Sequence, residues 1–160
     1  MHTIKAEPLT AADFAPYGEV LEAPAEFGRV HCDGSLSNGR AAARPSLSIA
    51  HVKPVDALPL RAVMMERHEF SSQSFVPLEP VRYLVLVAPT AADGRPDMSA
   101  ARAFLASGQQ GITYRQDVWH HPMTVLDRPG RFAIVMWLGG DGKDEEFHKL
   151  AEPLEVVFPA

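Results

Sequence analysis

The clearest evidence of fold class is the run Val81-Arg82-Tyr83-Leu84-Val85-Leu86-Val87. Successive side chains of a β-strand point to opposite faces, and here apolar side chains occupy both sets of positions. Residues 132–138 have the same character. Strands of this kind need protein cover on both faces. One face would line a barrel, and we expect a subunit interface to cover at least part of the other face.

Further strand candidates lie on both sides of this stretch, separated by turns that contain many of the 11 glycines and 14 prolines. Besides 81–87, strands are predicted at residues 46–52, 62–68, 111–115, 123–126, 131–138 and 154–158. Residues 10–14 are predicted to form an N-capped helical turn and residues 23–45 a loop, while residues 97–106 fit either a short helix or a strand. Because strands outnumber helices and do not alternate with long ones, the pattern favours a mainly β protein, an antiparallel sandwich or barrel with few short helices.

Composition limits what the protein can be. With 160 residues, 46% of them hydrophobic and 22% charged, the chain is expected to form one globular domain over residues 1–160. Its net charge of -5 argues against a nucleic-acid partner. The apolar run 132–138 is far shorter than the roughly 20 residues that cross a bilayer, so we expect no membrane partner and a cytoplasmic location.

Histidines are the main source of chemistry in this sequence. The single cysteine, Cys32, excludes an intramolecular disulfide and a thiolate zinc cluster, which leaves seven histidines. No Gly-x-Gly-x-x-Gly or Walker-type loop is present, so we expect no organic cofactor. The charged residues 141–146 are most simply a solvated surface.

The strongest constellation is residues 66–73, Glu-Arg-His-Glu-Phe-Ser-Ser-Gln. In a strand, Glu66 and His68 point to the same side, so two ligand-type residues share one face. This spacing resembles the first motif of the cupin superfamily, with Glu66 and His68 at its two histidine positions and Gln73 at its glutamate. A second constellation, Asp117-Val118-Trp119-His120, resembles the second cupin motif, which implies that His120 is the matching ligand from a later strand.

Most of the chain also resembles the ureidoglycolate lyase family of allantoin degradation. The resembling stretches include residues 14–20, 66–68, 73–77, 83–88, 95–97, 102–104 and, most specifically, Tyr114 with Val118-Trp119-His120-His121-Pro122. The resemblance implies a small cupin-like β-barrel of the double-stranded β-helix or jelly-roll type, a homodimer, and cleavage of ureidoglycolate to glyoxylate and urea. Pro80 departs from the glycine that is usual in the family after the first motif, which affects the shape of a loop.

The reaction needs a base, an acid and a cation. Cleaving the C–N bond of ureidoglycolate removes a hydroxyl proton and adds a proton to the departing urea nitrogen, which is work for His68, His120, Glu66 or Tyr114. A divalent metal held by His68, His120, Glu66 and Gln73 would polarise the hydroxyl, with nickel favoured by the resemblance and zinc or manganese as alternatives.

Other readings stay open at this point. In a metal-free version, Glu66 or His68 is the base, and Arg82 or Arg115 binds the substrate carboxylate. Tyr114 has the strand parity of His120, so its hydroxyl could donate to the departing nitrogen or to the carboxylate. His121 either supports the site from behind or lies exposed. The alternative functions are a hydrolase that releases ammonia from the same substrate, another cupin enzyme, and a non-catalytic cupin that binds a small carboxylic acid.

Overall fold

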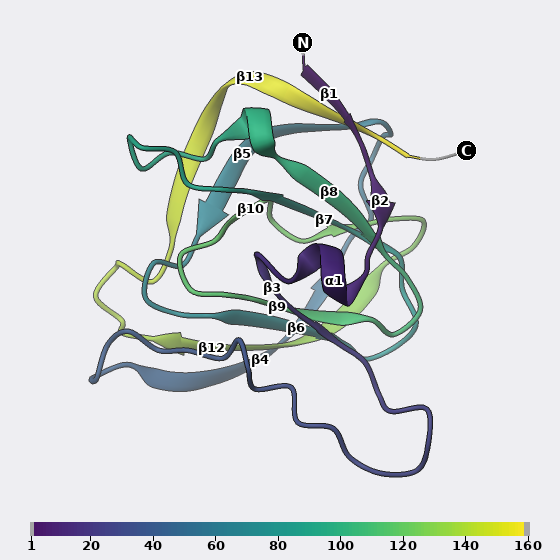
Figure 1. Ribbon diagram of the computed structural model, residues 1–160, viewed down its shortest axis with the longest axis vertical. Coiled ribbons are helices and arrows are strands. Elements are labelled where there is room, and N and C mark those ends of the chain that lie inside the picture. The colour runs from purple at the N-terminus through teal and green to yellow at the C-terminus, as the bar shows by residue number, and fades with distance from the viewer. Residues whose placement is uncertain (1, 159–160) are drawn as a thin grey trace.

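The computed structural model describes residues 2–158, and these residues are mainly β (Figure 1). The elements follow one another as β1 His2–Lys5, β2 Glu7–Pro8, α1 Ala11–Phe14, β3 Gly18–Leu21, β4 Arg44–Val52, β5 Leu60–Arg67, β6 Gln73–Pro77, β7 Tyr83–Ala88, the 3₁₀ turn η1 Met98–Ala100, β8 Arg102–Ala106, β9 Gly111–Tyr114, β10 Trp119–His120, β11 Thr124–Val125, β12 Gly130–Leu138 and β13 Glu146–Val157. Among the described residues, no helix is long and apolar enough to cross a membrane.

Two sheets form the architecture. The larger sheet has the order β1-β13-β5-β10-β7-β8-β2, with β11 also paired to β7, and the smaller one has the order β3-β9-β6-β12-β4. In Figure 1 the smaller sheet lies at the bottom of the view, while β13 and β1 cross the top. Pairing is antiparallel except where β1 joins β13 and β2 joins β8. Because β2 follows β1 directly, these two pairings nearly close the larger sheet into a barrel, which agrees with a cupin-like jelly roll.

Strand β7 is buried on both faces, as its apolar sequence predicted, but the cover differs from the expectation. Tyr83, Val85 and Val87 lie in a first core, shared with the smaller sheet, and Leu84 and Leu86 lie in a second core. The larger sheet curls around the second core, which also contains residues of β5, β8, β10 and β13. The expected subunit interface is therefore not needed on β7, because the chain itself covers its second face.

The other predicted elements agree with the structure in most places. The strands predicted at 46–52, 62–68, 111–115 and 131–138 correspond to β4, β5, β9 and β12, whereas 123–126 shortens to β11 and 154–158 belongs to the longer β13. Thr10 caps α1 by accepting a hydrogen bond from the Asp13 amide. Residues 97–106 contain both of the expected alternatives, η1 followed by β8. The sequence analysis missed β6, which is a central strand of the smaller sheet.

Candidate metal and active site

The candidate site lies at one end of the first core, between the two sheets. Glu66 of β5 lies directly opposite His120 of β10 in the larger sheet. His68 follows the end of β5. Gln73 begins β6 in the smaller sheet, where it is paired with Tyr114 of β9. Strand registers therefore bring together residues as far apart in the sequence as Glu66 and His120, which are 54 positions apart.

The ligand atoms of this cluster lie close together. One ligand atom from each of Glu66, His68 and His120 lies within 4.8 Å of the others. His120 Nε2 is 3.3 Å from Glu66 Oε1 and 3.2 Å from Gln73 Oε1. His68 and His120 are 4% and 1% exposed. The convergence that the two motif spacings predicted for His68, Gln73 and His120 is present in the structure.

Backbone carbonyls fix the tautomers of both imidazoles. His68 Nδ1 donates to the carbonyl oxygen of Asp144 at 2.8 Å, and His120 Nδ1 donates to that of Val118 at 2.9 Å. A carbonyl oxygen can only accept, so each Nδ1 carries a proton. In the neutral rings, each Nε2 therefore presents a lone pair to the cluster.

Four electron-pair donors thus face one another: two Nε2 atoms, the Glu66 carboxylate and the Gln73 amide oxygen. Buried acceptors that face one another are unfavourable unless a proton or a cation lies between them. A second proton on His120 would satisfy only part of the set, because His68 Nε2 is buried and has no hydrogen-bond partner within residues 2–158. The donor set fits a divalent first-row cation, since such an ion accepts imidazole nitrogen and carboxylate or amide oxygen together.

Electrostatics keep the cluster in the protonation states that bind cations. Burial raises the pKa of Glu66, but the adjacent imidazole of His120, followed by those of His68 and His121, outweighs it, and the pKa falls below its ordinary value. Burial, followed by repulsion from His120, lowers the pKa of His68. At neutral pH the carboxylate is therefore ionised and the His68 ring is neutral.

Tyr114 forms one wall of the site. Its ring stacks on the ring of His120, with centroids 4.0 Å apart and planes 15° from parallel. Burial raises the pKa of Tyr114 well above its ordinary value, with smaller contributions from Tyr83 and Glu66. The phenol is therefore protonated at any ordinary pH. No hydrogen bond of its hydroxyl occurs within residues 2–158, which leaves the O–H available to a ligand.

Three other predicted site residues lie outside the donor set. His121 Nδ1 and the Thr124 hydroxyl oxygen are 2.9 Å apart, within hydrogen-bond distance, and this contact supports the turn after β10. Arg82 is exposed, pairs with Asp127 at 3.1 Å and precedes β7, whereas His120 pairs with Val87 near the far end of that strand. Arg82 and Val87 are five residues apart along the chain, which corresponds to about 16 Å at 3.3 Å per strand residue.

Arg115 is also exposed, and its guanidinium donates to the Pro16 carbonyl at 3.3 Å. The structure therefore does not bring Arg82 or Arg115 to the cluster. Tyr114 does reach His120, but strand parity does not explain this, because β9 ends at Tyr114 and a turn with positive φ at Asp117 separates the two residues.

The sequence analysis missed the support that holds His68. Residues 141–146 were interpreted as solvated charges, but the main chain of Asp144 accepts from His68, and its carboxylate accepts from the amides of Gly139 and Gly140. Arg40 pairs with the same carboxylate. The sequence Gly139-Gly140-Asp141-Gly142 indicates a tight turn there. Nothing in it indicates a contact with His68, which is 71 positions before Gly139.

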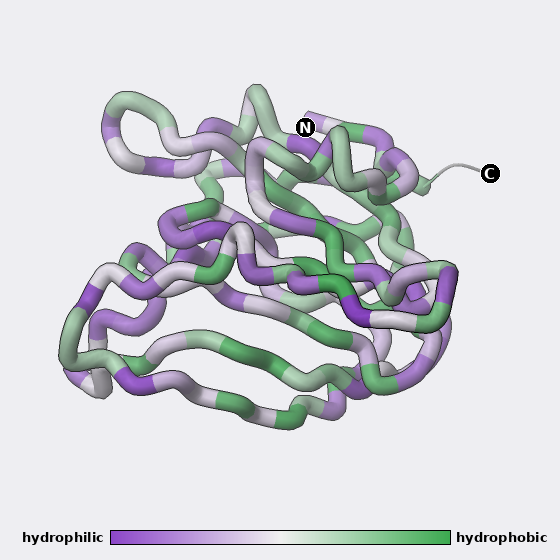
Figure 2. The backbone as a smooth tube through the Cα atoms, turned by 60° about the horizontal axis from the view of Figure 1, so that its bottom comes forward, coloured by the Kyte–Doolittle hydropathy of each residue, from purple (hydrophilic) through white to green (hydrophobic). Residues whose placement is uncertain are grey.

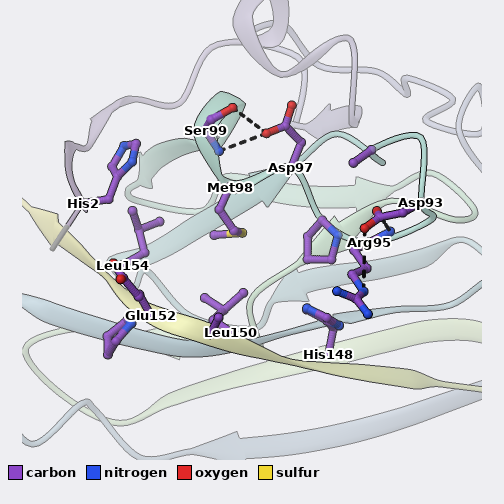
Figure 3. Close-up of a pocket in the computed structure, with 14 residues that line it drawn as sticks. His2, Asp93, Arg95, Asp97, Met98, Ser99, His148, Leu150, Glu152 and Leu154 are labelled. Carbon is purple, nitrogen blue, oxygen red and sulfur yellow. Dashed lines mark hydrogen bonds and ion pairs between the residues drawn. The ribbon is translucent and has the colours of Figure 1, made fainter.

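A cavity of about 530 Å³ lies on another part of the larger sheet (Figure 3). Its walls are β13 and the loop after β7, with Leu150 and Leu154 at its apolar floor. Figure 3 shows two local pairs among its polar groups: Asp97 accepts from the amide and hydroxyl of Ser99, and Arg95 pairs with Asp93. Within the described residues, the only cluster of three metal-ligand side chains is Glu66, His68 and His120, so the chemistry is assigned to that cluster.

Comparisons with known proteins show the family of this chain. Residues 1–157 match the family model described as ureidoglycolate lyase. The chain is 39% identical to a ureidoglycolate lyase of Burkholderia mallei (strain NCTC 10229), over 100% of this chain and 96% of that protein. It is also 39% identical to a ureidoglycolate lyase of Chelativorans sp. (strain BNC1), over 99% of each chain, and 35% identical to one of Brucella melitensis biotype 2 (strain ATCC 23457), over 92% and 90%. The chain belongs to the ureidoglycolate lyase family.

Proposed function

We propose that this protein is a ureidoglycolate lyase, a carbon–nitrogen lyase that cleaves ureidoglycolate to glyoxylate and urea in the breakdown of allantoin. The observation that carries the proposal is the buried cluster of Glu66, His68, Gln73 and His120, in a chain whose full length matches the family. The cluster supplies ionised oxygen and unprotonated nitrogen next to a free phenol, which suits proton transfer at a small anionic substrate. The proposed catalytic domain spans residues 1–160.

Proton bookkeeping suggests how the residues share the work. The carbon that is cleaved carries a hydroxyl, a carboxylate and the ureido nitrogen. As the C–N bond breaks, the hydroxyl loses a proton and the departing nitrogen gains one, so no net proton is consumed. We assign the base to Glu66, since its lowered pKa keeps it ionised, and the same carboxyl can return the proton to the nitrogen.

Tyr114 and His120 complete this arrangement. The raised pKa of Tyr114 keeps its hydroxyl protonated, so the hydroxyl can donate a hydrogen bond to the departing nitrogen or to the substrate carboxylate. His120 Nε2 lies 3.3 Å from Glu66 Oε1 and 3.2 Å from Gln73 Oε1, so a proton or a cation held between these atoms would join all three groups.

We further propose a divalent metal as the cofactor, held by His68, His120, Glu66 and Gln73. When bound, such an ion would lower the pKa of a hydroxyl in the substrate. It also supplies the positive charge for the substrate carboxylate that neither Arg82 nor Arg115 is placed to supply. Nickel is our first choice on the resemblance described above, and zinc and manganese also suit these ligands. Elemental analysis of protein purified without chelators decides among the three.

We propose a homodimer as the assembly and the cytoplasm as its location. The outer face of the smaller sheet supports the dimer: Leu47, Ile49 and Val76 are 72%, 64% and 40% exposed. Val135 lies opposite Leu47, and Ala133 lies between Ile49 and Val76. Figure 2 shows hydrophobic segments in green along the strands at the bottom of the view. Apart from His51 and Arg131 at one end of the β4–β12 pair, this face is apolar, which suits contact with a second copy of the chain about a twofold axis. The single cysteine suits a reducing compartment.

A product assay tests the proposed function. Purified protein is mixed with ureidoglycolate, and urea, ammonia and glyoxylate are followed against the spontaneous decay of the substrate. We expect urea and glyoxylate in equal amounts without ammonia. Ammonia in place of urea would assign a hydrolase, and no product above the spontaneous rate would leave a binding protein for small carboxylic acids. His31→Gln is the matched control, since His31 is exposed in the loop between β3 and β4 and should keep full activity.

A further inference from the structure

The turn between β12 and β13 is fastened by one carboxylate. Asp144 accepts hydrogen bonds from the amides of Gly139 and Gly140 at 2.6 and 3.0 Å. The same carboxylate pairs with Arg40, which comes from the long loop between β3 and β4. Arg40 also pairs with Asp141 at 2.9 Å. Two segments about 100 residues apart in the sequence are thereby joined at Asp144.

The main chain of the same residue reaches the candidate site. The carbonyl oxygen of Asp144 accepts the proton of His68 Nδ1 at 2.8 Å. This contact decides the tautomer of His68 and leaves Nε2 as a buried lone pair beside Glu66 and His120. No other hydrogen bond of the His68 ring occurs within residues 2–158, so this carbonyl is the one hydrogen-bond partner that orients the imidazole.

We propose that Arg40 and Asp144 form a positioning clamp for His68: they lock the turn so that the 144 carbonyl holds Nδ1–H and Nε2 faces the cluster. The clamp rests on the proposed function, because a positioned Nε2 matters only where a cation or a substrate binds. Neither Arg40 nor Asp144 touches the cluster through its side chain, so both are positioning residues.

The packing of the clamp supports a dedicated role. A Cβ atom at Gly139 would lie 2.6 Å from Cζ of Arg40, so only glycine permits the close approach of guanidinium and turn. The Arg40 guanidinium also lies over the Phe70 ring, 5.1 Å from its centroid. Phe70 is two residues after His68, so Arg40 contacts both the segment that carries His68 and Asp144, whose carbonyl holds the His68 ring. Arg40 Nε is buried without a hydrogen-bond partner among the described residues, a cost that its other contacts must outweigh.

The tautomer of His68 gives a direct test. Protein labelled with ¹⁵N-histidine and freed of metal is measured by long-range ¹H–¹⁵N NMR at pH 8, where an ordinary histidine is neutral. The His68 signals are assigned from their loss in His68→Gln. We expect wild-type His68 to be purely Nδ1–H, Asp144→Ala to show a mixture of tautomers, and Asp144→Asn, which keeps an oxygen for the two amides, to stay closer to wild type.

Asp141→Asn is the matched control, because Asp141 pairs with Arg40 but holds neither glycine amide nor His68. It should leave the tautomer unchanged. If Asp144→Ala does not fold, Arg40→Gln serves instead, because it keeps the caps on Gly139 and Gly140. A pure Nδ1–H tautomer in a folded Asp144→Ala or Arg40→Gln variant would overturn the clamp.

Metal affinity gives a second readout that does not depend on catalysis. Titration with Co²⁺, followed by its visible absorption and by calorimetry, should show affinity 10- to 100-fold weaker in Asp144→Ala than in wild type, as is usual when a group that orients a metal ligand is removed. Equal affinity would contradict the clamp. Since the tautomer is measured without metal or substrate, failure of the lyase assay and failure of the clamp are separate results.

Discussion

The ring of Tyr114 lies parallel to the ring of His120 at 4.0 Å, so one aromatic face sets the plane of a buried imidazole. The carbonyl of Val118 fixes the rotation of the same imidazole within that plane. Tyr114 therefore offers two separable contributions, a stacking surface and a hydroxyl. The stack restricts the direction of His120 Nε2, and the hydroxyl remains free for a ligand.

Tyr114→Phe separates the two contributions. The variant keeps the stack and loses the hydroxyl, so we expect its melting temperature to stay close to wild type while kcat falls by about 10²-fold, as is usual for the loss of one proton donor. Steady-state urea release measures the effect. Tyr83→Phe is the control: its buried hydroxyl donates to the Gln110 carbonyl at 2.7 Å, and its loss should lower stability by about 1–2 kcal/mol without affecting kcat. Unchanged kcat in Tyr114→Phe would remove the hydroxyl from the mechanism.

His68→Gln and His120→Asn test whether these histidines act in the reaction. Each substitution keeps much of the side chain and removes a titratable nitrogen that faces the cluster. We expect kcat to fall by about 10²- to 10⁴-fold in each variant, measured against spontaneous decay of the substrate. Near-normal urea release by folded variants of both residues would transfer the chemistry to Glu66 and Tyr114.

The outer face of the smaller sheet carries the expected dimer interface. A Leu47→Glu, Ile49→Glu double variant places two charges on this face, and we expect it to be monomeric at micromolar concentration, where wild type is a dimer burying more than about 1,000 Å². Light scattering coupled to size exclusion gives the masses. Val63→Glu, at another exposed apolar site on β5, should remain dimeric. A wild-type monomer, or a dimeric double variant, would contradict this interface.

Gly18 tests the packing of the smaller sheet. A Cβ atom there would lie 2.9 Å from the Thr113 carbonyl carbon and 3.0 Å from the Phe14 ring, so Gly18→Ala forces β3 away from β9. We expect a loss of about 1–3 kcal/mol in the free energy of unfolding. Gly34→Ala is the control, because its nearest neighbour would be a Glu19 oxygen at an ordinary 3.6 Å. Chemical denaturation should show a lower free energy of unfolding for Gly18→Ala than for Gly34→Ala. Equal values would show that β3 can shift away from β9 at little cost.

Asp13 gives a dependence of stability on pH. The hydrogen bond from the Thr10 hydroxyl, followed by that from Arg102, lowers the pKa of Asp13 below its ordinary value of 3.8. A carboxyl with a lowered folded pKa stabilises the fold above its unfolded pKa, and this contribution is lost as the pH falls through the folded pKa. Asp13→Asn should therefore melt below wild type at pH 7 and approach it as the pH drops below about 4. A constant difference in melting temperature between pH 7 and pH 3 would exclude this linkage.

Sequence patterns predicted the parts of the site that lie within single strands. The period of two placed Glu66 and His68 on one face, and the resemblance pointed to His120 as their partner from a later strand. Arg82 was misplaced because it precedes β7, whereas His120 pairs with Val87 near the far end of that strand. Strand β6 was missed because its short run between Ser72 and Leu78 contains too few residues to show a period.

Long-range contacts could not be predicted in this way. The clamp depends on a carbonyl oxygen, which every residue possesses, and on an arginine in a loop without periodic pattern. The second core also escaped prediction, since an apolar strand shows that it needs cover without showing whether the same chain provides it.

Strand β10 consists of two residues whose side chains face opposite cores: Trp119 packs in the second core, and His120 enters the site. The indole lies under the Arg67 guanidinium at 4.6 Å and donates to the Gly94 carbonyl at 3.3 Å. The packing of the Trp119 indole in the second core therefore helps to set the position of the His120 imidazole in the site. In a scan of all substitutions, changes at Trp119 should lower activity as strongly as changes at the ligands. Substitutions in the second core could therefore alter activity while every ligand stays unchanged.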